Sequence, residues 1–187
     1  MPTPPSLTPE QREVLEQASE RGRTFTGAAK VAAFNGWSIG VFAAVSILFG
    51  VASRSSFLVG VGLAIVARNE FVGRTRLRSI DPSGLELLWR NQVGFMALII
   101  VYCLWSMFRP VALPGAGLDG PMELVGEGAA ELVAFVKTVV YATVIVATAI
   151  FQGLNARYYF VRAARLRDYV RDTPQWVLDM QRSALLE

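Results

Sequence analysis

The sequence contains no histidine and a single cysteine, Cys103. Histidine is the side chain most often used as a general base, a metal ligand or a haem ligand, so its absence disfavours most familiar catalysis. One cysteine excludes a disulfide within the chain and a metal site that needs two thiolates. No pair of acidic residues lies inside an apolar run. We therefore expect no catalytic residues, no cofactor and no bound metal ion.

Charge is missing from long stretches of the chain. No charged side chain occurs from Val31 to Ala52, about 22 residues, and a helix of that length matches the hydrocarbon core of a bilayer. Apolar residues make up 53% of the chain, and the mean hydropathy is +0.40. The N-terminal segment has prolines and mixed charges where a signal peptide has a basic region followed by an apolar core, so we expect no cleavage. These features predict an all-α integral membrane protein.

Four apolar runs predict four membrane-spanning helices, at about residues 31–52, 55–70, 91–108 and 130–152. The second run is short: about 13 uncharged residues separate Arg54 from Arg68, a length that also suits a re-entrant segment. A full crossing is favoured, because it places about 15 of the 18 Lys and Arg residues on one side, as the positive-inside rule expects. Snorkelling of the flanking arginines or local thinning of the bilayer would complete the span. We predict a four-helix bundle in a bacterial inner membrane, with both termini in the cytoplasm.

The chain divides into three predicted regions. They are a cytoplasmic segment at 1–24 with a short amphipathic helix at Pro9–Gly22, a membrane domain at 25–157, and a basic cytoplasmic helix and tail at 158–187. No proline occurs between Pro121 and Pro174, so the last span is expected to continue as one helix of about 50 residues, well beyond the bilayer. Arginines interleaved with aromatic residues in the tail suit anionic headgroups of the inner leaflet. Because this basic segment is tethered to the membrane, we expect no nucleic-acid partner.

A polar stripe follows the fourth predicted span at helical spacing. Its members are Glu123, Glu127, Glu131, Thr138, Tyr141, Thr148 and Gln152. In a symmetric oligomer this face would line a water-filled pore with an acidic outer mouth, which favours cations. Alternatively, the glutamates belong to an exposed outer turn and the hydroxyls bond their own helix or a neighbouring span. Lys137 either snorkels outward or faces a cavity or a partner.

A second polar group lies at the predicted cytoplasmic membrane edge, with Lys30 and Asn35 of the first span at the same depth. Its members are Asn69, Glu70, Arg74, Arg90, Asn91, Gln92, Asn155 and Arg157. Glu70 is the only acid among many cations, so we expect it to pair with Arg74 or with an arginine of another helix. Because guanidinium groups suit phosphate geometry, the group could bind an anionic lipid headgroup. We favour the alternative, a structural lock that ties the inner ends of the spans together.

Small residues predict where helices approach closely. Gly36 and Gly40 form a GxxxG motif on the first span, and Gly60 with Ala64 repeats the spacing on the second. Such motifs bring two helix backbones together, either within a hairpin of the first two spans or between two chains.

No pattern in the sequence names a substrate or a reaction. We expect a non-catalytic structural or accessory membrane subunit that acts through oligomerisation or partner docking, with its cytoplasmic helices as the docking surface. The alternative is a homo-oligomeric cation channel lined by the fourth span, and an enzyme is third. Expected partners are membrane lipids with anionic headgroups at the cytoplasmic face, and further copies of the chain or another membrane protein.

Overall fold

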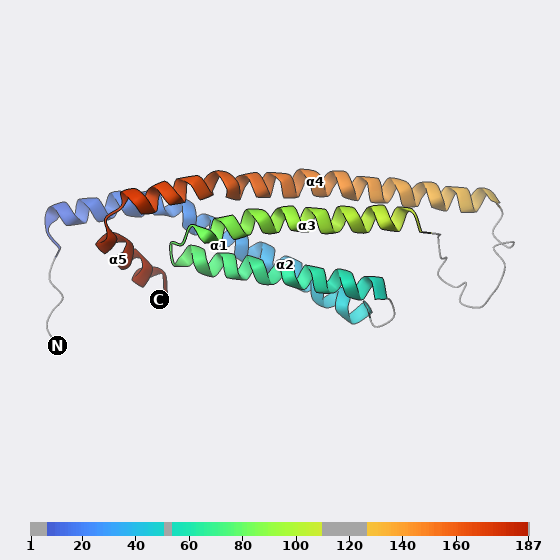
Figure 1. The fold of residues 1–187 in the computed structure, drawn as a ribbon, viewed down its shortest axis with the longest axis horizontal. Helices are drawn as coiled ribbons and strands as arrows, with labels where there is room; N and C mark the ends of the chain where they lie inside the picture. The colour runs from blue at the N-terminus through green and yellow to red at the C-terminus, as the bar shows by residue number, and fades with distance from the viewer. Residues whose placement is uncertain (1–6, 51–53, 110–126, 187) are drawn as a thin grey trace.

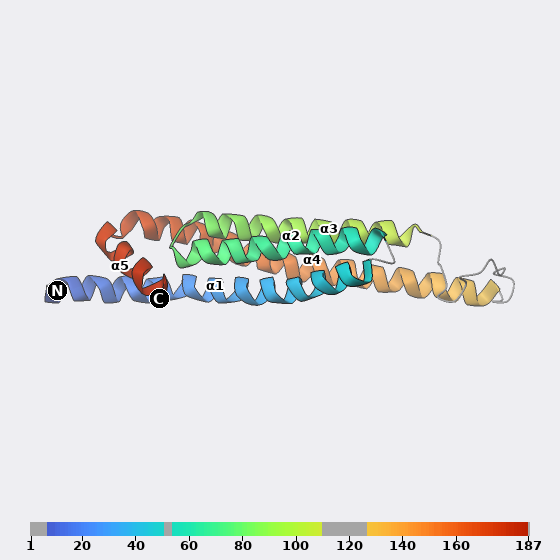
Figure 2. The same ribbon diagram turned by 90° about the horizontal axis from the view of Figure 1, so that it is seen from below.

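The computed structural model describes residues 7–50, 54–109 and 127–186. The secondary structure in these ranges is helical: α1 (Pro9–Gly50), α2 (Arg54–Arg78), α3 (Ser83–Met107), α4 (Glu127–Asp172) and α5 (Gln175–Leu186). The first four helices run lengthwise in an elongated molecule (Figure 1 and Figure 2). Helix α5 lies at the same end of the molecule as the start of α1 (Figure 1). The predicted all-α class is confirmed for the described residues.

Three of these helices, α1, α3 and α4, are long and apolar enough to cross a membrane. Among the described residues, helix α2 is not one of them. The helices are therefore consistent with a membrane location. A fourth crossing, by α2, stays a prediction.

Two helices are much longer than a bilayer span requires. Helix α1 continues unbroken from Pro9 to Gly50, so the short helix predicted at Pro9–Gly22 and the first span are one helix. Helix α4 runs from Glu127 to Asp172, as the absence of proline predicted, and measures about 70 Å. The predicted boundary between residues 157 and 158 therefore falls inside one helix.

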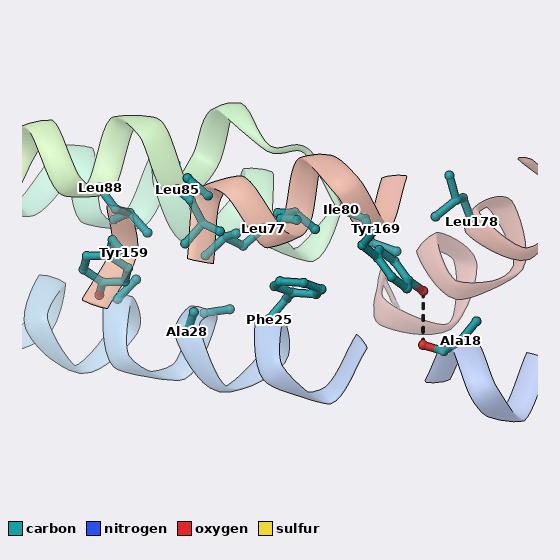
Figure 3. Close-up of a cluster of buried hydrophobic side chains, with 14 of the residues drawn as sticks. Ala18, Phe25, Ala28, Leu77, Ile80, Leu85, Leu88, Tyr159, Tyr169 and Leu178 are labelled. Carbon is teal, nitrogen blue, oxygen red and sulfur yellow. Dashed lines mark hydrogen bonds between the residues drawn. The ribbon is translucent and has the colours of Figure 1, made fainter. Parts of the chain in front are cut away.

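Neighbours in sequence are neighbours in space: α1 packs along α2, α2 along α3, and α3 along α4. Helix α1 meets α4 where the Phe25 and Tyr169 rings lie 5.5 Å apart. At this end of the molecule, which we call the base, all five helices share one buried apolar cluster (Figure 3). Its members are Ala18, Phe25, Ala28, Ala29, Ala32, Leu77, Ile80, Leu85, Leu88, Tyr159, Ala163, Leu166, Tyr169, Val177 and Leu178.

The turn between α2 and α3 is fixed within the base. The Asp81 amide bonds the Arg76 carbonyl at 2.9 Å, and the Ile80 amide bonds the Leu77 carbonyl at 3.0 Å, a Schellman pattern that ends α2. Ile80 has a φ of 54°, which strains a β-branched residue. Because its side chain is buried in the apolar cluster, packing offsets that strain. The Asp81 carboxylate accepts the Ser83 amide at 2.9 Å and the Ser83 hydroxyl at 2.7 Å, where α3 begins.

Candidate functional site: a buried polar cluster at the helix junction

Three polar side chains are buried between α2 and α3: Glu70 is 0% exposed, Asn91 7% and Gln92 1%. Asn91 Nδ2 donates to Glu70 Oε1 at 2.7 Å, and Gln92 Nε2 donates to the same oxygen at 2.8 Å. Asn91 Nδ2 also bonds the Val66 carbonyl at 3.0 Å, and Asn91 Oδ1 accepts Asn69 Nδ2 at 3.1 Å. We call Asn69, Glu70, Asn91 and Gln92 the polar cluster. It joins two helices through three buried side chains and the half-buried Asn69.

Glycines near the α2–α3 turn allow these two helices to approach. A Cβ atom at Gly73 would lie 2.5 Å from Leu88 Cγ, and one at Gly84 would lie 2.9 Å from the Gly73 carbonyl oxygen. Either atom would overlap its neighbour, so the close approach requires glycine at both positions. Gly73 lies one turn beyond Glu70, and this spacing brings Asn91 and Gln92 within reach of the carboxyl group. This contact was not predicted from the sequence, although glycines on both sides of the Asp81-Pro82 turn were a usable signal.

Helices α1 and α4 bring further polar groups to the same junction. Tyr159 of α4 is 0% exposed, and it lies near Asn35 of α1 and Glu70 of α2. A Cβ atom at Gly36 would lie 3.2 Å from Glu70 Cβ, so α1 passes directly against α2 here. Tyr159 was not among the residues predicted from the sequence. Its distance of seven residues from Gln152, two helical turns, was the available signal.

Several atoms of this junction lack a hydrogen-bond partner within the described part of the chain. They are Asn35 Nδ2, Glu70 Oε2, Gln92 Oε1 and Tyr159 Oη. Two amides donate to the Glu70 carboxyl group, and no salt bridge joins it to an arginine within the described ranges, so the predicted pairing with Arg74 or another arginine is wrong. An ionised carboxylate without a counter-ion is costly in such a buried place. The buried carboxyl group of Glu70 is therefore the polar group of this region whose desolvation is least offset by its neighbours.

The other residues predicted for this group lie outside the hydrogen bonds of the polar cluster. Arg90 and Arg157 are exposed, whereas Arg74 and Asn155 are half-buried. Arg90 stacks over the Trp89 ring, with the guanidinium carbon 5.5 Å from the ring centroid. Since Glu70 and Gln92 are enclosed by helices, a lipid headgroup does not reach them. The geometry favours the lock over the lipid site at these residues.

The polar stripe of α4 meets α3 at Tyr141. The Tyr141 and Tyr102 rings form an edge-to-face contact with centroids 6.5 Å apart, and Lys137 Nζ donates to the Arg109 carbonyl beyond the end of α3. Thr148 and Gln152 are half-buried, whereas Glu131 and Thr138 are exposed. The Thr138 hydroxyl bonds the Ala134 carbonyl of its own helix at 2.9 Å. Glu123 and the side chain of Glu127 lie outside the described residues.

The four predicted packing residues lie in the α1–α2 contact of one chain. A Cβ atom at Gly36 would lie 3.1 Å from the Phe71 ring, and one at Gly60 would lie 2.9 Å from the Ile47 backbone nitrogen. A Cβ atom at Gly40 would meet Ala67 Cβ at 3.9 Å, and Ala64 packs against the second buried apolar cluster. Of the two alternatives for these small residues, the structure uses them within the hairpin.

Comparisons with known proteins identify no relative. No family model, no curated protein and no solved structure matches this chain. Among the described residues, no group of three or more acidic or cysteine side chains is placed to hold a metal ion.

Proposed function

We propose that this protein is a non-catalytic membrane subunit that presents a rigid helical base to a partner protein. The observation that carries the proposal is the five-helix apolar cluster of the base. A bilayer span needs about 20 residues, yet α1 and α4 have 42 and 46 residues. The additional length of both helices forms the base. A chain that served only to occupy the membrane would not need this packed extension.

In this proposal the base lies in the cytoplasm of a bacterial cell, and four helices cross the inner membrane. Leu77 and Ile80 at the end of α2 pack in the same cluster as Phe25 and Ala28 of α1, which supports a return of α2 across the depth that α1 covers. The arginines of α2 beyond Ala67 and those of α4 beyond Asn155 lie toward the base. Such an arginine-rich side is the cytoplasmic one under the positive-inside rule.

Helix α5 offers the docking surface. Val177 and Leu178 are buried in the base, whereas Trp176 is 36% and Met180 41% exposed. Trp176 and Met180 are four residues apart, so they are neighbours on one helix face. Aromatic residues and methionine are enriched at protein interfaces, and polar residues such as Asp179 flank this pair as an interface rim would.

Docking is supported over membrane anchoring for this pair. Tyr169 lies 17 residues beyond Gln152 in the continuous helix α4, about 25 Å from the predicted end of the span. Trp176 follows at the start of α5, so an aromatic anchor at the headgroup level is a poor explanation for it.

Site-specific photo-crosslinking in native membranes tests the proposal. A photoreactive amino acid placed at Trp176 or Met180 of the full chain is expected to capture one discrete protein, either a second copy or a different subunit. The matched control is Phe42, which is also exposed but lies in the apolar run of α1, and there we expect lipid adducts only. No protein adduct from α5, or the same adducts from Phe42, would contradict the proposal.

The alternative, a cation channel lined by α4, has less support. Tyr141 contacts Tyr102 of α3 in the same chain, so this part of the stripe is not free to line a pore between subunits. The opposite face of α4 carries exposed large apolar side chains, including Phe135, Val139 and Ile150, which suit lipid.

A further inference from the structure

A groove of about 810 Å³ runs between α1 and α2. Small residues line part of it. We call three of them the floor: Gly40 and Ala44 of α1 and Ala64 of α2. These residues belong to the apolar halves of the two helices, upstream of Arg68. In the topology proposed above, this part of the groove lies within the hydrocarbon core of the bilayer. Its surroundings there are acyl chains.

Toward the base the groove is lined by the polar residues Arg68, Thr75 and Arg76 together with Phe71 and Val72. Arg68 and Arg76 are eight residues apart on α2, about 12 Å along the helix, and both are exposed. Within the described ranges, no carboxylate forms a salt bridge with either arginine. In the part of the chain that the structure describes, the Arg76 guanidinium donates a long hydrogen bond of 3.4 Å to the Ser83 hydroxyl. One continuous groove thus has an apolar floor and an end with two cations that no acid neutralises.

The two arginines of the groove favour a ligand that carries a negative charge. A guanidinium group binds phosphate oxygens through parallel hydrogen bonds, and basic residues near the membrane surface attract anionic lipids. A helix of another protein would cover the small-residue floor but leave the two arginines without anions, unless it carried acids at the same depth. A zwitterionic lipid would match the floor and gain less from the arginines.

We propose that the α1–α2 groove binds one anionic phospholipid, with its phosphate between Arg68 and Arg76 and an acyl chain along the floor at Gly40, Ala44 and Ala64. This site is distinct from the lipid site predicted from the sequence. Arg68 and Glu70 are two residues apart on α2, so they point to nearly opposite sides of the helix. The groove is open to the membrane, whereas the polar cluster is enclosed.

Native mass spectrometry of the full chain in mild detergent tests this site. After incubation with phosphatidylglycerol or with phosphatidylcholine of the same acyl chains, we expect one phosphatidylglycerol to be retained preferentially. The Arg68→Gln/Arg76→Gln variant is expected to lower that retention about tenfold. The Arg157→Gln/Arg165→Gln variant removes the same charge from exposed positions on α4, and we expect it to retain lipid as the wild type does.

A second variant tests the floor without a change of charge. Ala44 is exposed toward the groove, so Ala44→Leu fills part of the floor and is expected to lower retention while the chain stays folded. Equal retention of the two lipids would overturn the proposal, as would an equal loss in both arginine pairs, which indicates unspecific attraction. Unchanged retention in Ala44→Leu would exclude the acyl-chain floor and leave only headgroup attraction, which contradicts the proposed groove.

Discussion

Glu70 is the residue whose environment departs most from what its chemistry prefers. Its Oε1 atom accepts two amide hydrogens, and its Oε2 atom has no partner. In Glu70→Gln, the new carbonyl oxygen still accepts both amides and the possible charge is removed. In Glu70→Ala, Asn91 and Gln92 lose the acceptor for their buried donors, at a cost of about 1–3 kcal/mol for each unpaired group.

We therefore expect Glu70→Ala to lower the free energy of unfolding by about 3 kcal/mol, while Glu70→Gln leaves it unchanged or raises it. Thermal unfolding of both variants in the same detergent measures the difference as a shift in Tm. If Glu70→Gln lost as much stability as Glu70→Ala, the lock would require the acid itself, and a purely structural role would be contradicted.

The partner of Glu70 also shows what the sequence could not provide at the scale of single residues. Because Glu70 is the only acid among many cations, the sequence indicated that its carboxyl group needs a bonding partner. The choice between arginine and amide, however, depends on the register of α2 against α3, which Gly73 and Gly84 set through backbone contact. Asn91 and Gln92 belonged to the predicted group, yet their bond to Glu70 follows from that register alone.

At the scale of the helices, some glycines lie in close helix–helix contacts and others have open space beside them. A Cβ atom at Gly60 would lie 2.9 Å from a backbone nitrogen, and one at Gly73 would lie 2.5 Å from the buried Leu88, whereas Gly94 and Gly153 have nothing within 4 Å. Gly60→Ala and Gly73→Ala are expected to lower Tm, because the helices must separate. Gly94→Ala and Gly153→Ala serve as controls and are expected to raise stability by up to about 1 kcal/mol, since alanine favours helix.

The outcome that would contradict this picture is a reduced Tm in the controls with none in the packed positions. The α1–α2 and α2–α3 contacts would then not depend on glycine. The sequence indicated Gly36, Gly40 and Gly60 through their spacing, but it did not indicate which helix each of them faces.

The orientation of α4 is a second prediction at this scale. With Cys103 replaced by serine, a short thiol-reactive cross-linker is expected to join Tyr102→Cys and Tyr141→Cys within one chain, because the two rings are in contact. The matched control is Tyr102→Cys with Thr143→Cys, since Thr143 lies two positions away and faces nearly the opposite side of the helix. A dominant product between two chains through Tyr141→Cys would contradict this orientation and support a pore.

At the scale of the whole molecule, the sequence predicted the helical class and the great length of α4, because both follow from apolar runs and the absence of proline. It did not predict the base. Ala18, Phe25 and Tyr169 are separated by up to about 150 residues in the chain, and their contact depends on α1 continuing unbroken past Gly22. The sequence predicts a helix end only at a strong helix-breaking residue such as proline. Gly22 alone does not end α1.

The base also determines how docking must be tested, because α5 belongs to its core. Val177 and Leu178 are buried there, and Arg182 Nε donates to the Ser79 carbonyl at 3.0 Å. Deletion of residues 173–187 is therefore expected to expose Tyr169 and the neighbouring apolar cluster, lower Tm and speed proteolysis of the base. Trp176→Ala/Met180→Ala leaves the buried Val177 and Leu178 in place, so it is expected to lower Tm less than the deletion does while it abolishes capture of the partner. A deletion variant as stable as the wild type would show that α5 is an appendage, and the base would then be a four-helix core without it.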